Sequence, residues 1–551
     1  MIATGRKPPL RLIIVIPTMV MLVACASVPS TNVESLKADI PEGSGLVVAE
    51  TLNNGSRVVG RIINWTEIVL WRDGYQGEDG TFTIESLPYS LSTQSYLGAV
   101  PAGTYRIGAL YAFLHDGNVG QSAHAMVPPA LGTFEVKAGH VTNLGAILYQ
   151  PFQNRTWVEE EYPDYAMTRI ANDDLWSTTS LAIPEIAAKI DASLPVLGWG
   201  PDNFDAERDT AARLMKDAAL PTNMLALSDG DFLLSGLNGG LYSLRESEWR
   251  NHSLSSHYKI TDLAELPNGQ LLIGSEFGRL SLSGPSGETL RDIPIVQGVQ
   301  HVVDIDLSDG GIAYVMTIAE ADYRVYRFMA DTESLLLIKT LPKGSKGIFG
   351  ISHPVLIGTA DGAAMFMDKI MYRYVEAADQ WSSTKAEEYI ELHQQLDGYV
   401  SGIPHSSWSG TKAAQFSADD GYTWTALEEK VGLLGSSQAP TYRFKDGEFI
   451  RTGEGVDVNF FKDSEVKDQV PVLSTTDNGV NWTPIGAVPR GCTTMAVEAS
   501  TDGLIYVLCS DGGTFSSKDR GRTWSLSLPS RTPDFDAFPG QLKIRYERDT
   551  D

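Results

Sequence analysis

The sequence is short of cysteine, of clustered positive charge and of long apolar runs. Its 551 residues contain 3 cysteines and 43 Lys and Arg against 69 Asp and Glu, which leaves a net charge of -26. No basic run follows residue 11, so the contacts to phosphate that nucleic acid requires are missing. The longest apolar stretch, Leu12–Ala24, is too short for a helix that crosses a bilayer, which needs roughly 20 residues. Nucleic acid is therefore not an expected partner, and no membrane-spanning helix is expected.

That apolar stretch instead has the order of an export signal. Arg6, Lys7 and Arg11 precede it, and it ends in Leu-Val-Ala followed by Cys25. This ending resembles the bacterial lipobox, and the resemblance implies cleavage before Cys25 and acylation of its thiol, with palmitate-type chains as the membrane anchor. Residues 1–24 are then a lipoprotein signal peptide. The alternative is an ordinary secreted protein.

The residues after the cleavage point bear on location. Ala26 resembles the sorting class that reaches the outer membrane of Gram-negative bacteria, which implies a cell-envelope protein that faces the periplasm or the surface. Residues 25–45 are rich in Ser, Pro, Thr, Glu and Gly without periodicity, so we expect a flexible tether.

The two remaining cysteines, Cys492 and Cys509, flank a predicted hairpin with its turn near Ser500–Gly503. They would lie on neighbouring strands, close enough for a disulfide in an oxidising compartment. Two buried free thiols are the alternative.

The chain after the tether divides into segments of different pattern. Glycine is frequent, at 52 residues, and residues 46–150 contain short alternating strands separated by turns, which predict a β-sandwich domain. Parts of it, at 100–107 and 134–139, resemble the small sandwich modules of prealbumin and of carboxypeptidase regulatory domains. Residues 151–220 predict a partly helical connector, whose acidic run at 159–161 could be a solvated face or a cation site. Residues 531–551 are expected to form a C-terminal tail.

A repeat occupies residues 221–530. The segment 227–241 aligns without gaps to 266–280, and Asp-Gly or Asn-Gly turns recur with glycines at 230, 269, 310, 398, 447 and 503. Their intervals of 39, 41, 88, 49 and 56 residues fit four-stranded units better than the shorter, uniform repeats of a solenoid. A further unit around Gly362 brings the number to seven. The predicted fold class is therefore all-β, a β-sandwich followed by a seven-bladed β-propeller.

The last three units share an octet that resembles the Asp-box, or BNR-like, repeat. Such repeats occur in the propellers of sialidases, sortilin-type receptors, polysaccharide-cleaving enzymes and photosystem assembly factors, where the aspartate lies on the blade periphery. The resemblance implies a structural role, with the carboxylate accepting amide hydrogen bonds inside a turn; metal ligands or catalytic acids are the alternative. The residues are Ser417, Asp419, Gly421 and Trp424; Thr475, Asp477, Gly479 and Trp482; and Ser517, Asp519, Gly521 and Trp524.

Signatures of catalysis and metal binding are sparse. There is no Arg-Ile-Pro segment before the repeat of the kind a sialidase carries, and a carboxylate pair for glycoside hydrolysis cannot be chosen from the sequence. Asp304-Ile-Asp306-Leu-Ser-Asp309-Gly310 resembles a calcium loop but lacks the later Glu. His252 and His257 form no zinc pattern. We expect no metal and no cofactor, and the catalytic residues, if any, are unknown.

These observations favour a binding or assembly scaffold over an enzyme. The expected partners are a membrane, through the lipid anchor, and an envelope protein or glycan bound by the propeller face, which insertions at 372–391 and 456–469 would enlarge. The alternative is a glycoside hydrolase of the sialidase-like or polysaccharide-cleaving type.

Overall fold

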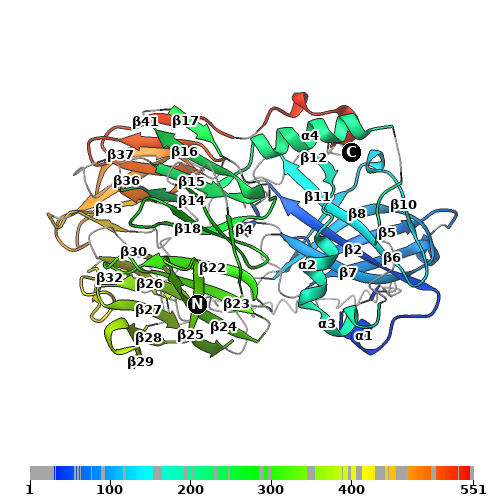
Figure 1. The fold of residues 1–551 in the computed structure, drawn as a ribbon. Coiled ribbons are helices and arrows are strands. Elements are labelled where there is room, and N and C mark those ends of the chain that lie inside the picture. Colours follow the sequence, from blue (N-terminus) through cyan, green and yellow to red (C-terminus); the bar gives the residue numbers. More distant parts are fainter. Residues whose placement is uncertain are drawn as a thin grey trace, which may run out of the picture.

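The computed structural model contains two bodies of β-structure that lie side by side (Figure 1). It describes residues 30–545 except for 153–163, 344–353, 405–412, 429–440, 454–467 and other gaps of six residues or fewer. Residues 1–24, predicted to be a signal peptide, and Cys25 lie outside the described residues, as does the acidic run at 159–161. Among the helices of the described part, none has the length and apolarity needed to cross a bilayer.

The first body is a β-sandwich domain built from one continuous sheet. Its central strands are β2 and β11, which run parallel to each other, and β7, which pairs antiparallel with β2. The sheet closes over a core that includes Trp65, Tyr96, Tyr105 and Phe134. Its strands are β1 (Ser30–Thr31), β2 (Ser44–Asn53), β5 (Glu67–Arg72), β6 (Thr81–Ser86), β7 (Gln94–Pro101), β8 (Gly103–His115), β9 (Gly120–Met126), β10 (Phe134–Val136), β11 (Val141–Pro151), β12 (Tyr165–Ile170), β13 (Val196–Leu197) and β42 (Lys543–Ile544); β3 (Arg57–Val58) and β4 (Arg61–Ile62) form a separate pair.

The segment expected as a connector contributes to this domain. It contains the helices α2 (Leu175–Ala182), α3 (Pro184–Ala187) and α4 (Asp205–Asp217), and also strands β12 and β13 of the sheet. Helix α4 buries Ala211 and Met215 in the sandwich core. Helices α2 and α3 pack with α1 (Val33–Ala38) through a second apolar cluster that contains Leu36 and Ile186.

The second body is a seven-bladed β-propeller, which confirms the predicted fold class. Each blade is a sheet of four consecutive antiparallel strands. Blade 1 contains β14 (Pro221–Ala226), β15 (Phe232–Gly236), β16 (Leu241–Arg245) and β17 (Glu248–Asn251); blade 2, β18 (Ile260–Glu265), β19 (Leu271–Ser275), β20 (Arg279–Leu282) and β21 (Arg291–Ile293); blade 3, β22 (Val299–Leu307), β23 (Ala313–Ala319), β24 (Asp322–Met329) and β25 (Ser334–Pro342); blade 4, β26 (Val355–Thr359), β27 (Gly362–Met367), β28 (Ile370–Val375) and β29 (Gln380–Lys385).

The last three blades carry the repeated octets. Blade 5 contains β30 (Tyr389–Gln394), β31 (Val400–Pro404), β32 (Gln415–Ser417) and β33 (Thr425–Ala426); blade 6, β34 (Tyr442–Arg443), β35 (Phe449–Thr452), β36 (Gln469–Thr475) and β37 (Thr483–Pro489); blade 7, β38 (Cys492–Val497), β39 (Ile505–Cys509), β40 (Thr514–Ser517) and β41 (Ser525–Leu528). The expectation of an inserted loop at 372–391 is wrong, because these residues belong to β28, β29 and β30. Most of the other expected insertion lies outside the described residues.

The ring closes by packing, since blades 1 and 7 exchange no strand. The rings of Phe232 and Tyr506 meet at 4.0 Å across the closure, and Trp249 Nε1 donates to the carbonyl oxygen of Ser527 at 3.1 Å. Beyond blade 7 the chain returns to the sandwich, where Phe538 and Leu542 are buried in its core and β42 pairs with β12. The sandwich domain therefore holds both ends of the propeller.

Polar groups also join the two bodies at blade 2. The buried carboxylate of Glu276 accepts hydrogen bonds from the backbone N–H of Thr93 at 3.0 Å and from its hydroxyl at 2.5 Å. Glu50 of the sandwich accepts from Asn172 Nδ2 at 3.0 Å and from the Tyr258 hydroxyl at 3.3 Å. Burial raises the pKa of Glu50 to about 7.

Candidate functional site

The inner strands of blades 2 and 3 carry carboxylates close to the centre of the propeller. The first strand of each blade lies nearest the central axis of a propeller. Among the acids of the described first strands, which also include Glu265 on β18 and Glu391 on β30, Asp262 on β18 and Asp304 and Asp306 on β22 have raised pKa values and are the candidate acids. Asp304 and Asp306 are two residues apart, so they share one face of their strand.

Each of these carboxylates is already bonded to the next blade. Asp262 Oδ2 accepts from the N–H of Ile305 at 2.7 Å. Asp304 Oδ2 accepts from Leu356 N–H at 2.8 Å, and Asp306 Oδ2 accepts from Gly358 N–H at 2.9 Å. These bonds connect blade 2 to blade 3 and blade 3 to blade 4, so the acids hold neighbouring inner strands together.

The protein environment favours the protonated form of the three acids. Burial raises the pKa of Asp262 to about 6 and that of Asp306 to about 7, although the amide donors oppose the change. The pKa of Asp304 is raised well above its usual value, by burial and then by the negative charge of Asp262. Asp262 and Asp306 can therefore exchange protons near pH 6 to 7, which is also the property of a general acid.

Sequence reasoning missed this role. From the sequence, the stretch from Asp304 to Gly310 resembles only an imperfect calcium loop, and no role is predicted for Asp262. Extending the ungapped match at an offset of 39 residues toward the N-terminus places Asn223 opposite Asp262, and Asn223 Nδ2 donates to the carbonyl oxygen of Thr261 in the next blade at 2.7 Å. Polar residues recurring on first strands were the available signal.

The repeated octets form three turns, which we call the Asp turns: residues 417–424, 475–482 and 517–524. Each connects the third strand of its blade to the fourth, outermost strand, at β32–β33, β36–β37 and β40–β41. This placement puts Asp419, Asp477 and Asp519 toward the outside of the ring, away from the inner strands.

The first Asp turn illustrates the local geometry. The Ser417 hydroxyl accepts from Gly421 N–H at 2.8 Å and donates to Asp419 Oδ1 at 2.8 Å. Asp419 also accepts from the backbone N–H of Thr423 at 2.8 Å and from its hydroxyl at 2.6 Å. Trp424 Nε1 donates to the carbonyl oxygen of Gly421 at 2.9 Å. The carboxylate is thereby fully engaged inside its own turn.

The other two Asp turns repeat these bonds. Asp477 accepts from Asn481 N–H at 2.9 Å and Nδ2 at 2.7 Å, and Asp519 accepts from Thr523 N–H at 2.8 Å and its hydroxyl at 2.7 Å. The hydroxyls of the first residues, Thr475 and Ser517, accept from Gly479 N–H at 3.2 Å and Gly521 N–H at 2.7 Å.

The tryptophans of these two turns differ in their contacts. Trp524 Nε1 donates to the carbonyl oxygen of Gly521 at 2.9 Å, whereas Trp482 lies beneath the Arg451 guanidinium, whose carbon is 4.0 Å from the ring centroid. The tryptophan side chain thus makes different contacts in different Asp turns, whereas the carboxylate accepts the same kind of hydrogen bonds in all three.

Hydrogen bonds stabilise the charged form of these aspartates. The backbone N–H of Asn481 lowers the pKa of Asp477 to about 2, and the Thr523 hydroxyl does the same for Asp519. For Asp419, partial burial opposes the change, but the bonds from Thr423 outweigh it and the pKa is lowered. These groups stay ionised at neutral pH, so they are poor proton donors.

The residue after each aspartate contacts the preceding blade. Asp420, Asn478 and Arg520 have left-handed φ angles of 55°, 58° and 59°. Asp420 Oδ2 accepts from Ala360 N–H at 3.0 Å, and the carbonyl oxygen of Asn478 accepts from Glu428 N–H at 2.8 Å. Arg520 bonds Asp446 at 2.5 Å and Glu448 at 3.0 Å. The Asp turns thus also connect blades, on the outer side of the ring.

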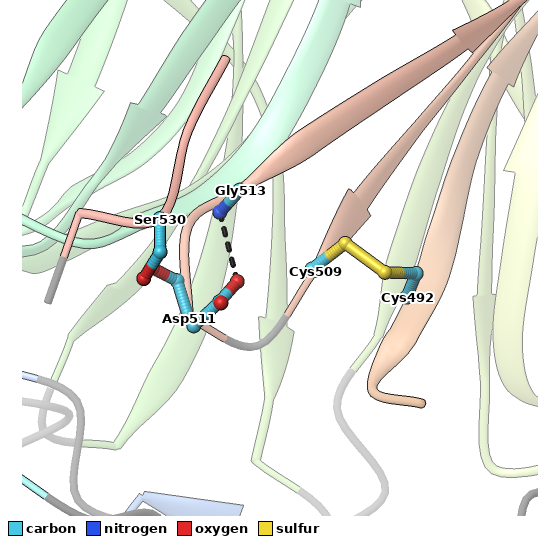
Figure 2. Close-up of a disulfide and its surroundings, with 5 residues drawn as sticks. All are labelled: Cys492, Cys509, Asp511, Gly513 and Ser530. Atoms are coloured by element: carbon cyan, nitrogen blue, oxygen red, sulfur yellow. Dashed lines mark hydrogen bonds between the residues drawn. A yellow bond between two sulfur atoms is a disulfide. The ribbon is translucent and has the colours of Figure 1, made fainter. Parts of the chain in front are cut away.

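Blade 7 contains the disulfide. Cys492 on β38 and Cys509 on β39 are directly paired across the two strands, and their sulfur atoms are bonded (Figure 2). The following turn is held by Asp511, whose Oδ1 accepts from Gly513 N–H at 2.9 Å (Figure 2). The disulfide joins β38, the innermost strand of blade 7, to the neighbouring strand β39.

Metal ligands do not converge in the part of the chain that the structure describes: no group of three or more His, Cys, Asp or Glu there could hold an ion. Asp309 is exposed at the turn after β22 and is not brought together with Asp304 and Asp306 as a ligand set.

No family model and no curated protein matches the chain. Solved structures do resemble it. YCF48 bound to D1 peptide is 15% identical over 50% of this chain and 85% of its own, with a TM-score of 0.38. Virginiamycin B lyase from Staphylococcus aureus is 10% identical over 54% of this chain and 94% of its own, with a TM-score of 0.39. A putative 6-phosphogluconolactonase from Bacteroides fragilis is 14% identical over 54% and 97%, with a TM-score of 0.36. At such identities no shared function follows.

Proposed function

We propose that the propeller is a binding or assembly scaffold for an envelope protein or glycan, and not an enzyme. One observation carries the proposal. Three acids of the described inner strands, Asp262, Asp304 and Asp306, each use a carboxylate oxygen to accept a hydrogen bond from a backbone N–H of the neighbouring blade. With the Asp turns on the outer side, these bonds make a stiff ring whose loops are free to bind.

The proposal places this scaffold in the cell envelope, held there by lipid on Cys25. Support comes from the sequence alone, through the charge, the apolar length and the lipobox-like ending of residues 1–24. Two or more acyl chains would anchor the protein stably. Replacing Cys25 with Ser should move the folded protein from the membrane fraction to the soluble fraction, and retention in the membrane would refute the anchor.

We assign the three octets to the Asp-box class as part of the same proposal. The internal bonds of Asp419, Asp477 and Asp519 and their lowered pKa values support a structural role for each carboxylate. In this role they shape the blade edge and contribute no ligand contact.

A glycoside hydrolase is the second candidate, favoured by one observation. The pKa values of Asp262 and Asp306, about 6 and about 7, suit a general acid on the propeller axis.

The two candidates are separated by one paired experiment. The full chain is incubated with envelope polysaccharides while product is followed, and it is also crosslinked in membranes and recovered with its partners. A scaffold gives a stable complex without turnover, and Asp306→Asn leaves the complex intact. Turnover that Asp306→Asn abolishes, without a stable complex, would replace the scaffold by the hydrolase.

A further inference from the structure

The sandwich domain contains a hollow that the proposed propeller function does not use. It has a volume of about 450 Å³ and opens where β5 ends and β6 begins. Pockets for small ligands occupy about 300–1,000 Å³. Side chains of Trp71, Arg72, Asp73, Tyr75 and Arg106 line it, together with turn glycines and Thr81.

The wall of the hollow is shaped by a bulge in β8. The pairing of β5 with β8 shifts register at Gly108, and a Cβ atom there would lie 2.3 Å from Trp71 Cε2. Only glycine therefore lets the indole lie against the strand. Arg106, paired with Trp71 across the strands, holds its guanidinium carbon 4.6 Å from the indole centroid. Such stacking orients the guanidinium and leaves its N–H edge available to a ligand.

A second guanidinium, that of Arg72 at the end of β5, also lines the hollow. Arg72 donates from Nη2 to the carbonyl oxygen of Ala102 at 2.5 Å, and its guanidinium carbon lies 4.7 Å from the Tyr75 ring centroid. A Cβ on Gly103 would lie 2.6 Å from Arg72 Nε, so a larger residue there would displace the guanidinium. Tyr75 itself is 52% exposed and presents an apolar ring at the rim.

Neither arginine has an ion-pair partner in the part of the chain that the structure describes. Within the described residues no carboxylate lies at ion-pair distance from Arg72 or Arg106, whereas Arg208, Arg324 and Arg373 each have such a partner. The described lining of the hollow presents two cations and one acid, Asp73, and Asp79 lies in the same turn, in a chain whose net charge is -26. Two guanidiniums without an ion-pair partner offer binding groups for an anion.

We propose that this hollow binds an acidic saccharide through the carboxylate of a uronate unit. The two guanidiniums suit a carboxylate, which they can bind through paired N–H donors. Asp73 and Thr81 offer acceptors to sugar hydroxyls, and Tyr75 offers an apolar surface to the ring. A strongly acidic peptide fits less well, because Asp73 repels additional negative charge and would find few hydroxyl donors.

The test is calorimetric titration of the full chain with tetragalacturonate, with a neutral tetrasaccharide of equal length and with an Asp- and Glu-rich peptide. We expect binding of tetragalacturonate alone. Arg106→Gln should weaken it about tenfold or more, because the variant loses the charge-assisted hydrogen bonds to the carboxylate. Tyr75→Ala, at an exposed site, should weaken it less. Arg451→Gln removes a guanidinium stacked on a tryptophan of the propeller and should change nothing.

Three results would overturn the inference. They are no heat at millimolar tetragalacturonate, equal or tighter binding of the neutral sugar or the peptide, and unchanged affinity in a folded Arg106→Gln variant. None of them bears on the propeller scaffold, because the hollow lies in the sandwich domain.

Discussion

Aspartates in two regions of the propeller accept similar hydrogen bonds, but their pKa values are shifted in opposite directions. On the inner strands of blades 2 and 3, Asp262 and Asp306 have pKa values raised by burial, to about 6 and about 7. In the Asp turns of blades 6 and 7, Asp477 and Asp519 have pKa values lowered to about 2 by hydrogen bonds. Both groups accept backbone amides, so the difference comes from solvent access rather than from the acceptor role.

The comparison shows how one residue type serves two purposes. An inner aspartate bonds the next blade, and its loss separates parts of the ring that are distant in sequence. A turn aspartate bonds residues four positions away, and its loss loosens a single hairpin. We therefore expect unequal costs for changes in the two regions.

The largest effect is expected for Asp304→Ala. The change leaves the buried N–H of Leu356 without its acceptor across the blade 3 to blade 4 contact. A buried donor without a partner costs about 1–3 kcal/mol, and we expect a loss of about 3 kcal/mol in the free energy of unfolding, measured by urea denaturation.

The matched control is Asp309→Ala, on an exposed residue that follows the same strand. It should change the free energy of unfolding by less than about 0.5 kcal/mol. Equal losses in the two variants would contradict the inter-blade role of Asp304.

A middle effect is expected for Gly421→Ala in the first Asp turn. Gly421 has a φ of +82°, and a Cβ atom there would lie 2.7 Å from Phe366 Cζ of blade 4. Left-handed strain and this contact together should cost about 2 kcal/mol, measured as a lowered denaturation midpoint. Gly310→Ala, whose Cβ would meet nothing closer than 3.7 Å, should cost less. Equal denaturation midpoints for the two variants would contradict the claim that the left-handed backbone and the close contact at Gly421 constrain the turn.

The smallest effect is expected for Asp519→Ala. Its bonds to Thr523 and Ser517 lie in a solvent-facing turn, so their loss is screened and partly replaced by water, and we expect a loss of about 1 kcal/mol. The neighbouring exposed Lys518→Ala is the control and should be neutral in the same melt. A loss as large as that of Asp304→Ala would erase the contrast between the regions.

The repeat made the propeller predictable, but not every strand of the sandwich. Asp-Gly and Asn-Gly turns between alternating strands marked the units, since positive φ at glycine is a local requirement. Strand β2, by contrast, is buried along its whole length between β7 and β11, so it shows no alternation. Strand β42 was also hidden, because two residues near the C-terminus pair with a strand more than 370 positions earlier.

The candidate site was predictable in part for the same reason. The octets are local, so the bonds of Asp419 follow from residues within eight positions. The bond from Asp304 to Leu356 spans 52 positions and depends on how two blades meet, which no single repeat contains. The hollow beside Trp71 depends on a bulge at Gly108 in another strand.

The free energy of unfolding as a function of pH tests the contrast most directly, in the wild type, Asp306→Asn and Asp519→Asn. Between pH 4 and 7 the inner aspartates are ionised in the unfolded chain, where their pKa has its ordinary value of 3.8, but they keep their protons in the folded protein. The free energy of unfolding therefore falls as the pH rises. Below pH 4 the turn aspartates become protonated in the unfolded chain, whereas in the folded protein they stay ionised. The free energy of unfolding therefore falls as the pH falls. We predict that Asp306→Asn flattens only the upper limb and Asp519→Asn only the lower limb. An unchanged upper limb in Asp306→Asn would contradict the account.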